Sequence, residues 1–263
     1  MKAHAKINLA LVAGPARADG KHEVATVLQR VELADRLELE PGDRLRVDGF
    51  AGDTLVRRAL ERVAAAAGAD PHWAVQIDKE IPVAAGLGGG SSDAATAMRL
   101  ANETLEKPLS PEALHTLAAE LGADVPFFLR EGPQLGEGDG SDLRPLDLPQ
   151  SYTVLLVVPA AETKLSTAAV YAAFDERRGE EGYEQRREQL LTALAAGDLA
   201  AFPPNDLASS PLADELRALG AFRADVSGAG PAVYALFDDP AQTQAAAARM
   251  DARGLVWVGS PAW

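Results

Sequence analysis

A glycine-rich loop between residues 82 and 93 is the part of the sequence best suited to chemistry. Glycines let the backbone adopt positive φ and approach a ligand closely, and the N-terminus of a following helix carries roughly half a positive charge. Together with two hydroxyls, these features predict a polyphosphate site. From the residues alone, a flexible glycine turn before a helix remains the alternative. The loop residues are Pro82, Val83, Ala84, Ala85, Gly86, Leu87, Gly88, Gly89, Gly90, Ser91 and Ser92.

Other glycine and metal motifs do not match. The sequence has no G-x-x-x-x-G-K-[ST] loop, and Ser91 stands where a dinucleotide fingerprint needs its third glycine. His22-Glu23 lacks a second histidine four positions on, so it is not a zinc-protease motif. The absence of cysteine excludes disulfides, thiolate catalysis and cysteine-ligated metals.

Lys6 and Asp124 are charged residues that could neutralise charge and accept a proton in phosphoryl transfer. The reaction requires in-line positioning, neutralisation of the moving phosphoryl group and removal of the hydroxyl proton. Asp124 precedes the apolar run Val125 to Phe128, which would exclude water. By residue type alone, a solvated cap for Asp124 and a surface position for Lys6 are the simpler interpretations, because charged residues are mostly exposed.

Composition narrows the class of protein. The 263 residues are 47% hydrophobic and 24% charged, as in globular proteins, and no stretch has the apolar length of a membrane span. A net charge of -14 without a basic tract repels a phosphate backbone and argues against nucleic acid as a partner. The N-terminus imitates a secretory signal poorly, so we expect a cytoplasmic protein that interacts with neither membrane nor nucleic acid.

Strands and helices alternate without a regular βαβ rhythm, which predicts an α+β fold. The best signalled helix has Ser110 as N-cap, Pro111 at its first position and Gly122 beyond its end. A second helix should open at Ser91 or Ser92 and follow a short strand, Trp73 to Ile77. The polar stretches 136–141 and 145–150 read as a connection between two domains. We find no internal repeat.

The glycine loop resembles the ATP loop of the GHMP kinases, the superfamily of galactokinase, homoserine kinase and mevalonate kinase. Further blocks occur in the family's order: A-K-I-N-L at 5–9, R-A-D-G-x-H at 17–22, L-G-A-D-V-P-F-F at 121–128, N-D-L at 205–207 and S-G-A-G-P at 227–231. The resemblance spans nearly the whole chain. It implies an N-terminal ATP-binding domain over 1–148, a C-terminal α/β sandwich domain over 149–263, and an active site in the cleft between them.

The resemblance also implies roles for the charged residues and the cofactors. Asp124 would be the general base and Lys6 would keep it ionised and stabilise the developing alkoxide. ATP would be bound by residues 82–92, with Lys79 near the base or ribose and Thr54 beside the adenine, where relatives usually have Asn. Mg2+ would bridge the phosphates, with Ser92 as the first candidate ligand and Asp124 as the second.

The R-x-D-G-x-H turn and the L-G-A-D-V-P-F block resemble the branch of the superfamily that phosphorylates a cytidine diphosphate-linked methylerythritol. This small-molecule substrate would be read by residues of three of these blocks and by Tyr171, which matches an aromatic that stacks on cytosine. Lys21 stands where relatives have Tyr, so a two-sided aromatic sandwich around cytosine is not expected. Ala229 and Ser141 also depart from the family pattern. The implied substrate-binding residues are Asn8, Lys21, His22, Tyr171 and Gly228.

Three alternatives stay open. A sister GHMP kinase for mevalonate, homoserine or a sugar would share the loop but should lack the R-x-D-G-x-H turn. A nucleotide-binding sensor that has lost catalysis is disfavoured by the presence of Lys6 and Asp124. A Rossmann oxidoreductase is disfavoured by the glycine spacing. The expected assembly is a monomer or a weak homodimer.

Overall fold

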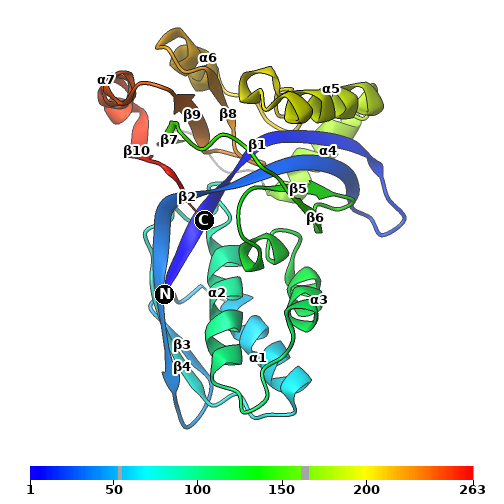
Figure 1. Ribbon diagram of the computed structural model, residues 1–263, viewed down its shortest axis with the longest axis vertical. Coiled ribbons are helices and arrows are strands. Elements are labelled where there is room, and N and C mark those ends of the chain that lie inside the picture. Colours follow the sequence, from blue (N-terminus) through cyan, green and yellow to red (C-terminus); the bar gives the residue numbers. More distant parts are fainter. Residues whose placement is uncertain (53–54, 161–165, 263) are drawn as a thin grey trace. The chain divides into compact units, whose positions relative to one another are not determined.

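The computed structural model describes residues 1–52, 55–160 and 166–262. Contacts divide the chain into two compact units, and neither is one continuous segment. The first unit contains Met1–Ala5, Leu33–Val83 and Gly88–Glu131, and the second contains Lys6–Glu32, Ala84–Leu87 and Gly132–Trp263. Both units mix helices and strands, which confirms the α+β class (Figure 1). The domain boundary between 148 and 149 stays a prediction.

The first unit joins a small sheet to helices. Strand β4 (Trp73–Asp78) pairs antiparallel with the end of β2 (His22–Pro41), with Leu37 opposite Ile77, and parallel with β3 (Arg46–Asp48). The α-helices of this unit lie to one side of this sheet in Figure 1. They are α1 (Leu55–Ala67), α2 (Gly89–Glu103) and α3 (Pro111–Leu121), followed by a short 3-10 helix, Pro126–Leu129.

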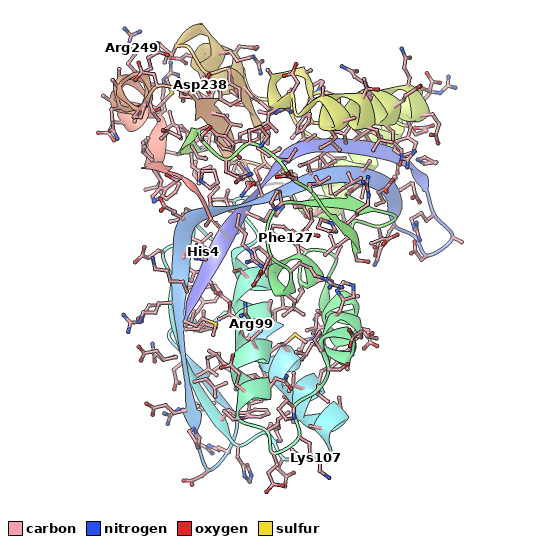
Figure 2. The ribbon with its side chains drawn as sticks, in the orientation of Figure 1. His4, Arg99, Lys107, Phe127, Asp238 and Arg249 are labelled. Atoms are coloured by element: carbon pink, nitrogen blue, oxygen red, sulfur yellow. The ribbon has the colours of Figure 1, made fainter. Side chains whose placement is uncertain are left out.

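Apolar spacing and caps explain these helices. In α1 the positions Val56, Ala59, Leu60 and Val63 are fully buried and form one stripe. Helix α2 is buried almost continuously from Ser92 to Met98, so it is the central helix of the unit. Ser110 Oγ accepts a hydrogen bond from the Ala113 N–H at 3.2 Å, which confirms the predicted cap of α3. In Figure 2, Phe127 is a buried side chain of this unit, whereas Arg99 and Lys107 are exposed.

The second unit contains an antiparallel sheet with strand order β10-β7-β9-β8. Helices α6 (Pro211–Ala218) and α7 (Pro240–Met250) pack on one face, around Leu155, Leu216, Phe237 and Met250. The strands are β7 (Thr153–Pro159), β8 (Arg223–Val226), β9 (Val233–Phe237) and β10 (Gly254–Gly259). Helices α4 (Thr167–Glu176) and α5 (Tyr183–Ala196) also belong to this unit.

Other strands of the second unit pair with the first half of β2. Strand β5 (Gln134–Glu137) pairs with β2 at Val27 opposite Leu135, and with β6 (Asp142–Pro145). Strand β11 (Pro261–Ala262) pairs with β2 at Val31 and Arg30. Residues 136–141, expected from the sequence to belong to a polar connection between domains, end β5 and form the turn of the β5–β6 hairpin. The N-terminal strand β1 spans Lys2–Ala16 and pairs with β2.

Helix α2 begins earlier than predicted. It starts at Gly89 rather than at Ser91 or Ser92, because Gly88 takes the left-handed N-cap conformation with φ of 69°. Among the described helices, none is long and apolar enough to cross a membrane.

Candidate functional site

The glycine loop follows β4, and three of its residues have a left-handed backbone conformation. Ala84, Gly86 and Gly88 have φ of 64°, 86° and 69°. Glycine adopts this region without penalty, whereas Ala84 is strained there, and such strain is concentrated at functional sites. The loop has the irregular conformation and the following helix that the sequence predicts. Its role in binding phosphate stays a prediction.

Within the second unit, Gly86 lies directly against the 227–231 loop. A Cβ on Gly86 would be 2.3 Å from the Ser227 carbonyl oxygen, and Ser227 Oγ donates to the Gly86 carbonyl at 3.0 Å. The Ala232 N–H donates to the Ala85 carbonyl at 2.9 Å. Only a residue without a side chain fits at position 86, because the backbone approach leaves no space.

Lys6 and Asn8 are buried next to this loop. Their exposed fractions are 3% and 4%, so a surface position for Lys6 is wrong. Lys6 Nζ donates to Asn8 Oδ1 at 2.6 Å, and the Asn8 N–H donates to Ser227 Oγ at 3.2 Å. A Cβ on Gly228 would lie 3.2 Å from Asn8 Oδ1 and 3.6 Å from Lys6 Nζ. The structure thus brings together a predicted catalytic lysine and two predicted substrate residues.

The backbone of Lys6 also contacts the glycine loop. Its N–H donates to the Leu87 carbonyl at 2.9 Å. Asn8 Nδ2 in turn donates to Thr26 Oγ1 at 2.8 Å, which fixes the amide orientation and leaves Asn8 Oδ1 facing the ammonium. A buried ammonium beside backbone amides can stabilise developing negative charge.

Asp124 belongs to the first unit. It lies between the end of α3 and the short 3-10 helix, with Val125 and Phe127 fully buried after it, and Asp124 itself is half-buried. The apolar residues that follow Asp124 are therefore buried, and the exclusion of water from its carboxylate stays a prediction. Thr54, the predicted adenine contact, lies outside the described residues.

Lys79 takes part in a buried cluster of charges that sequence reasoning missed. Its ammonium forms ion pairs with Asp35 and with Asp93, the latter at 2.7 Å. Burial lowers the pKa of Lys79, but the hydrogen bonds that its ammonium donates to both carboxylates outweigh burial and raise that pKa. Burial raises the pKa of Asp93 to about 7, against the opposing effect of Lys79. The ring of Phe50 lies 5.8 Å from the ammonium.

Of the residues predicted to contact cytosine, His22 and Tyr171 have side chains that contact each other, whereas the ammonium of Lys21 is paired elsewhere. The His22 and Tyr171 rings stack at 4.6 Å with an interplanar angle of 21°, and His22 Nε2 lies 2.7 Å from Asp175 Oδ1. The Lys21 ammonium instead binds Asp139. Tyr171 and Phe174 belong to α4, which packs its apolar side against β1.

Lys21 and Ser141, two residues that depart from the family pattern, both bind the carboxylate of Asp139. Burial alone would raise the pKa of Asp139, but hydrogen bonds from Lys21 and Ser141 lower it to about 2. Ser141 Oγ donates to Asp139 Oδ1 at 2.6 Å. Lys21 and Ser141 are therefore explained together, as two groups that hold the same carboxylate at the turn of the β5–β6 hairpin.

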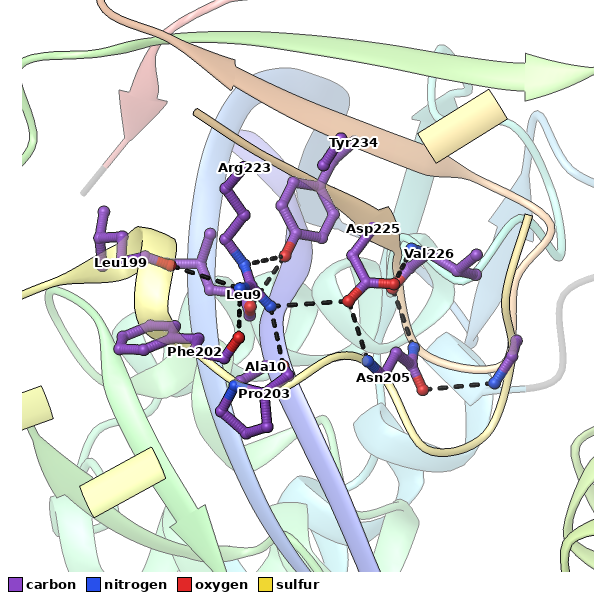
Figure 3. Close-up of polar contacts among 12 residues, drawn as sticks. Leu9, Ala10, Leu199, Phe202, Pro203, Asn205, Arg223, Asp225, Val226 and Tyr234 are labelled. Atoms are coloured by element: carbon purple, nitrogen blue, oxygen red, sulfur yellow. Dashed lines mark hydrogen bonds and ion pairs between the residues drawn. The ribbon is translucent and has the colours of Figure 1, made fainter. Parts of the chain in front are cut away.

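A buried polar network around Arg223 supports the strand that carries Lys6 and Asn8 (Figure 3). Arg223 donates to the Phe202 carbonyl at 2.8 Å and to Tyr234 Oη at 2.8 Å. The Tyr234 hydroxyl donates to the Leu9 carbonyl of β1, also at 2.8 Å. Asn205 Nδ2 donates to the Gly228 carbonyl at 2.7 Å. The network thus ties β1 and the 227–231 loop to β8 and β9.

Replacing Tyr234 by Phe should destabilise the protein by about 1–3 kcal/mol, because Arg223 Nε and the Leu9 carbonyl each lose a buried partner. Tyr152→Phe is the matched control, since the Tyr152 hydroxyl is buried and has no partner among the described residues. The midpoints of urea unfolding measure the loss of stability in each of the two variants. Equal midpoints for the two variants would contradict the role given to the Tyr234 hydroxyl.

Comparison with known proteins identifies similar chains. Residues 54–132 match the family described as GHMP kinases N terminal domain, and residues 190–255 match GHMP kinases C terminal. The 4-diphosphocytidyl-2-C-methyl-D-erythritol kinase of Nocardia farcinica is 38% identical over 97% of this chain and 90% of its own length. Its counterpart of the same name in Pelotomaculum thermopropionicum is 38% identical over 94% of this chain and 92% of its own length.

Solved structures are similar over the whole chain. The crystal structure of a 4-(cytidine 5'-diphospho)-2C-methyl-D-erythritol kinase superposes with a TM-score of 0.83 at 32% identity, covering 100% of this chain and 99% of that chain. A homoserine kinase from Cytophaga hutchinsonii superposes with a TM-score of 0.72 at 18% identity, covering 97% and 95%, which shows a common fold.

Proposed function

The chain belongs to the GHMP kinase family, and on that premise we propose that it transfers the γ-phosphate of ATP to the 2-hydroxyl of 4-diphosphocytidyl-2-C-methyl-D-erythritol. The observation that carries the proposal is the buried Lys6–Asn8 pair, which lies beside Gly228 and the backbone of the glycine loop. It is a cation placed in a water-poor environment next to the predicted phosphate loop, and phosphoryl transfer requires such a cation. Relatives that are 35–39% identical carry this enzyme name.

The chemistry is a displacement at the γ-phosphorus. The substrate oxygen forms a bond to phosphorus, the bond from phosphorus to the β–γ bridging oxygen breaks, and ADP leaves with that electron pair. We assign Asp124 as the base that accepts the hydroxyl proton and Lys6 as the cation that stabilises the developing charge. Residues 82–92 would bind the triphosphate through backbone N–H groups. Residues 1–148 are proposed as the ATP-binding domain and 149–263 as its C-terminal partner.

We propose that Mg2+ is held mainly by the nucleotide. The described residues contain no group of three or more His, Cys, Asp or Glu that could hold a metal ion. Magnesium in nucleotide sites commonly takes only one or two protein ligands and completes its shell with phosphate oxygens and water. Ser92, in the first turns of α2, and Asp124 would supply those ligands, and the bound ion would neutralise phosphate charge.

The cytidine end of the substrate would be read by His22 and Tyr171. Their stacked rings form an aromatic surface with a polar edge, which suits a nucleobase. Because the Lys21 ammonium binds Asp139, Lys21 would offer its alkyl stem rather than its charge to the second face of cytosine. Asn8 and Gly228 would contact the end of the substrate that receives the phosphate.

Coupled ADP release with Mg-ATP tests the function. We expect turnover of the cytidyl substrate and none of mevalonate, homoserine, galactose or the methylerythritol phosphate that lacks cytidine. Turnover of another acceptor would support the assignment as a kinase and contradict the proposed substrate. Turnover of no acceptor would favour the sensor that keeps the fold without catalysis.

A further inference from the structure

Both ends of the glycine loop are linked to the carboxylate of Asp35 on β2. One end is bonded to it directly, and the other end is linked to it through Lys79 and Asp93. Asp35 Oδ1 accepts the N–H of Glu80 at 2.7 Å and the N–H of Ile81 at 2.8 Å, which are the residues that lead into the loop. The other oxygen of Asp35 binds the Lys79 ammonium. The same ammonium donates to Asp93 Oδ2 at 2.7 Å, and Asp93 lies in α2 immediately after the loop.

The charges of this cluster are buried and largely satisfied by one another. The side chains of Asp35, Asp93 and Lys79 are 0%, 2% and 14% exposed. An ammonium has three N–H donors, and the two carboxylates occupy at least two of them. A lysine that binds phosphate acts as a point charge, but here two carboxylates surround the charge of Lys79. Lys79 is therefore poorly placed to supply net positive charge to a triphosphate.

The cluster also contacts the first residue of α2. A Cβ on Gly89 would lie 3.4 Å from Lys79 Nζ and 3.0 Å from a methyl carbon of Ile81. The ammonium therefore lies close to the point where the loop becomes helix, and a side chain at position 89 would meet it. In addition, Asp93 Oδ1 is buried without a hydrogen-bond partner among the described residues. A buried carboxylate oxygen left unpaired reduces stability, so the cluster is not arranged for stability alone.

We propose that Asp35, Lys79 and Asp93 are positioning residues that hold both ends of the glycine loop in the conformation that binds the triphosphate of ATP. The inference rests on the proposed function, because it takes ATP as the ligand. It changes the role expected for Lys79: the lysine acts through Asp35 and Asp93 on the loop rather than by direct contact with the nucleotide.

The test compares carboxylate and lysine variants with a matched control on the same strand. Asp35→Asn should raise the KM for ATP at least about 10-fold while kcat and the KM for the acceptor stay within about twofold, because only the loop is displaced. Lys79→Gln should have a similar effect, and the double variant should be no worse than the worse single variant, since the residues act as one unit. Glu38→Gln is the control, because Glu38 is an exposed carboxylate of β2 paired with Arg36.

Two outcomes would overturn the proposal. If Lys79→Gln raises the KM for ATP and Asp35→Asn does not, the lysine contacts the nucleotide directly. If the variants lower the melting temperature but leave the KM for ATP equal to that of Glu38→Gln, the cluster serves stability only. If Asp35→Asn does not fold, Asp93→Asn decides by the same criteria, because its amide oxygen can still accept from Lys79.

Calorimetric binding of ADP without acceptor separates this proposal from the substrate assignment. A parent protein that binds ADP but phosphorylates none of the acceptors would refute the substrate, and weaker ADP binding by Asp35→Asn would still support the positioning role. A parent protein that binds no ADP would overturn both proposals.

Discussion

An Asp124→Asn variant is expected to turn over at least about 100-fold more slowly than the parent protein, with nearly unchanged affinity for ATP. The amide has the size of the carboxylate but cannot accept the hydroxyl proton. Its neighbours Val125 and Phe127 are fully buried, so the substitution should leave the packing around position 124 unchanged. The rate of ADP release gives kcat, and calorimetry gives the ATP affinity.

Glu120→Gln is the control for Asp124→Asn. Glu120 lies on α3, is half-exposed and pairs with Arg62, so the same carboxylate-to-amide change there should leave kcat unaltered. If Asp124→Asn keeps full activity, Asp124 is not the base. If it loses ATP affinity to the same degree as kcat, Asp124 acts through the nucleotide or its Mg2+ rather than on the hydroxyl.

Gly86→Ala is expected to reduce kcat/KM for ATP at least about 30-fold, since two costs of about 1–2 and 1–3 kcal/mol combine at this position. The new methyl group would lie 2.3 Å from the Ser227 carbonyl oxygen, and φ at this position is 86°, in the left-handed region. The loop must move or the 227–231 segment must yield. Initial rates at varied ATP concentration measure the effect.

Gly68→Ala separates backbone strain from the close contact. Gly68 has φ of 65°, but a Cβ there would meet nothing within 4 Å. This variant should lose about 1 kcal/mol of stability and keep the KM for ATP of the parent protein. A Gly86→Ala protein with a normal KM for ATP would show that the triphosphate binds away from this part of the loop.

Local signals predicted the helix with the most complete caps. Helix α3 begins after Ser110 as predicted, with Pro111 at its first position and Gly122 beyond its end. Strand pairing over long sequence separation was harder to predict. The residues of β5 and β6 are rich in Gly, Pro and Asp, which resembles a linker, and they become strands because they pair with each other and with β2.

For the site, family resemblance named residues whose partners the sequence could not show. Lys6 and Gly228 stand far apart in the chain, and only the fold reveals that Lys6 and Asn8 both lie beside Gly228. Asp35 was missed because it is one charged residue in an otherwise amphipathic strand, and its partners Lys79 and Asp93 follow no local spacing. Such clusters are created by tertiary contacts, which no window of sequence displays.

Strands β1 and β2 each contribute residues to both compact units. Each unit is therefore built from several segments of the chain, and cutting the polypeptide at any single bond cannot release either unit whole. A fragment that starts at residue 149 would lack the β1 carbonyl that Tyr234 binds and the paired strands β2 and β5. Limited proteolysis or split expression should consequently yield fragments that stay inactive until both pieces of chain are present, as in complementation between fragments of a single folding unit.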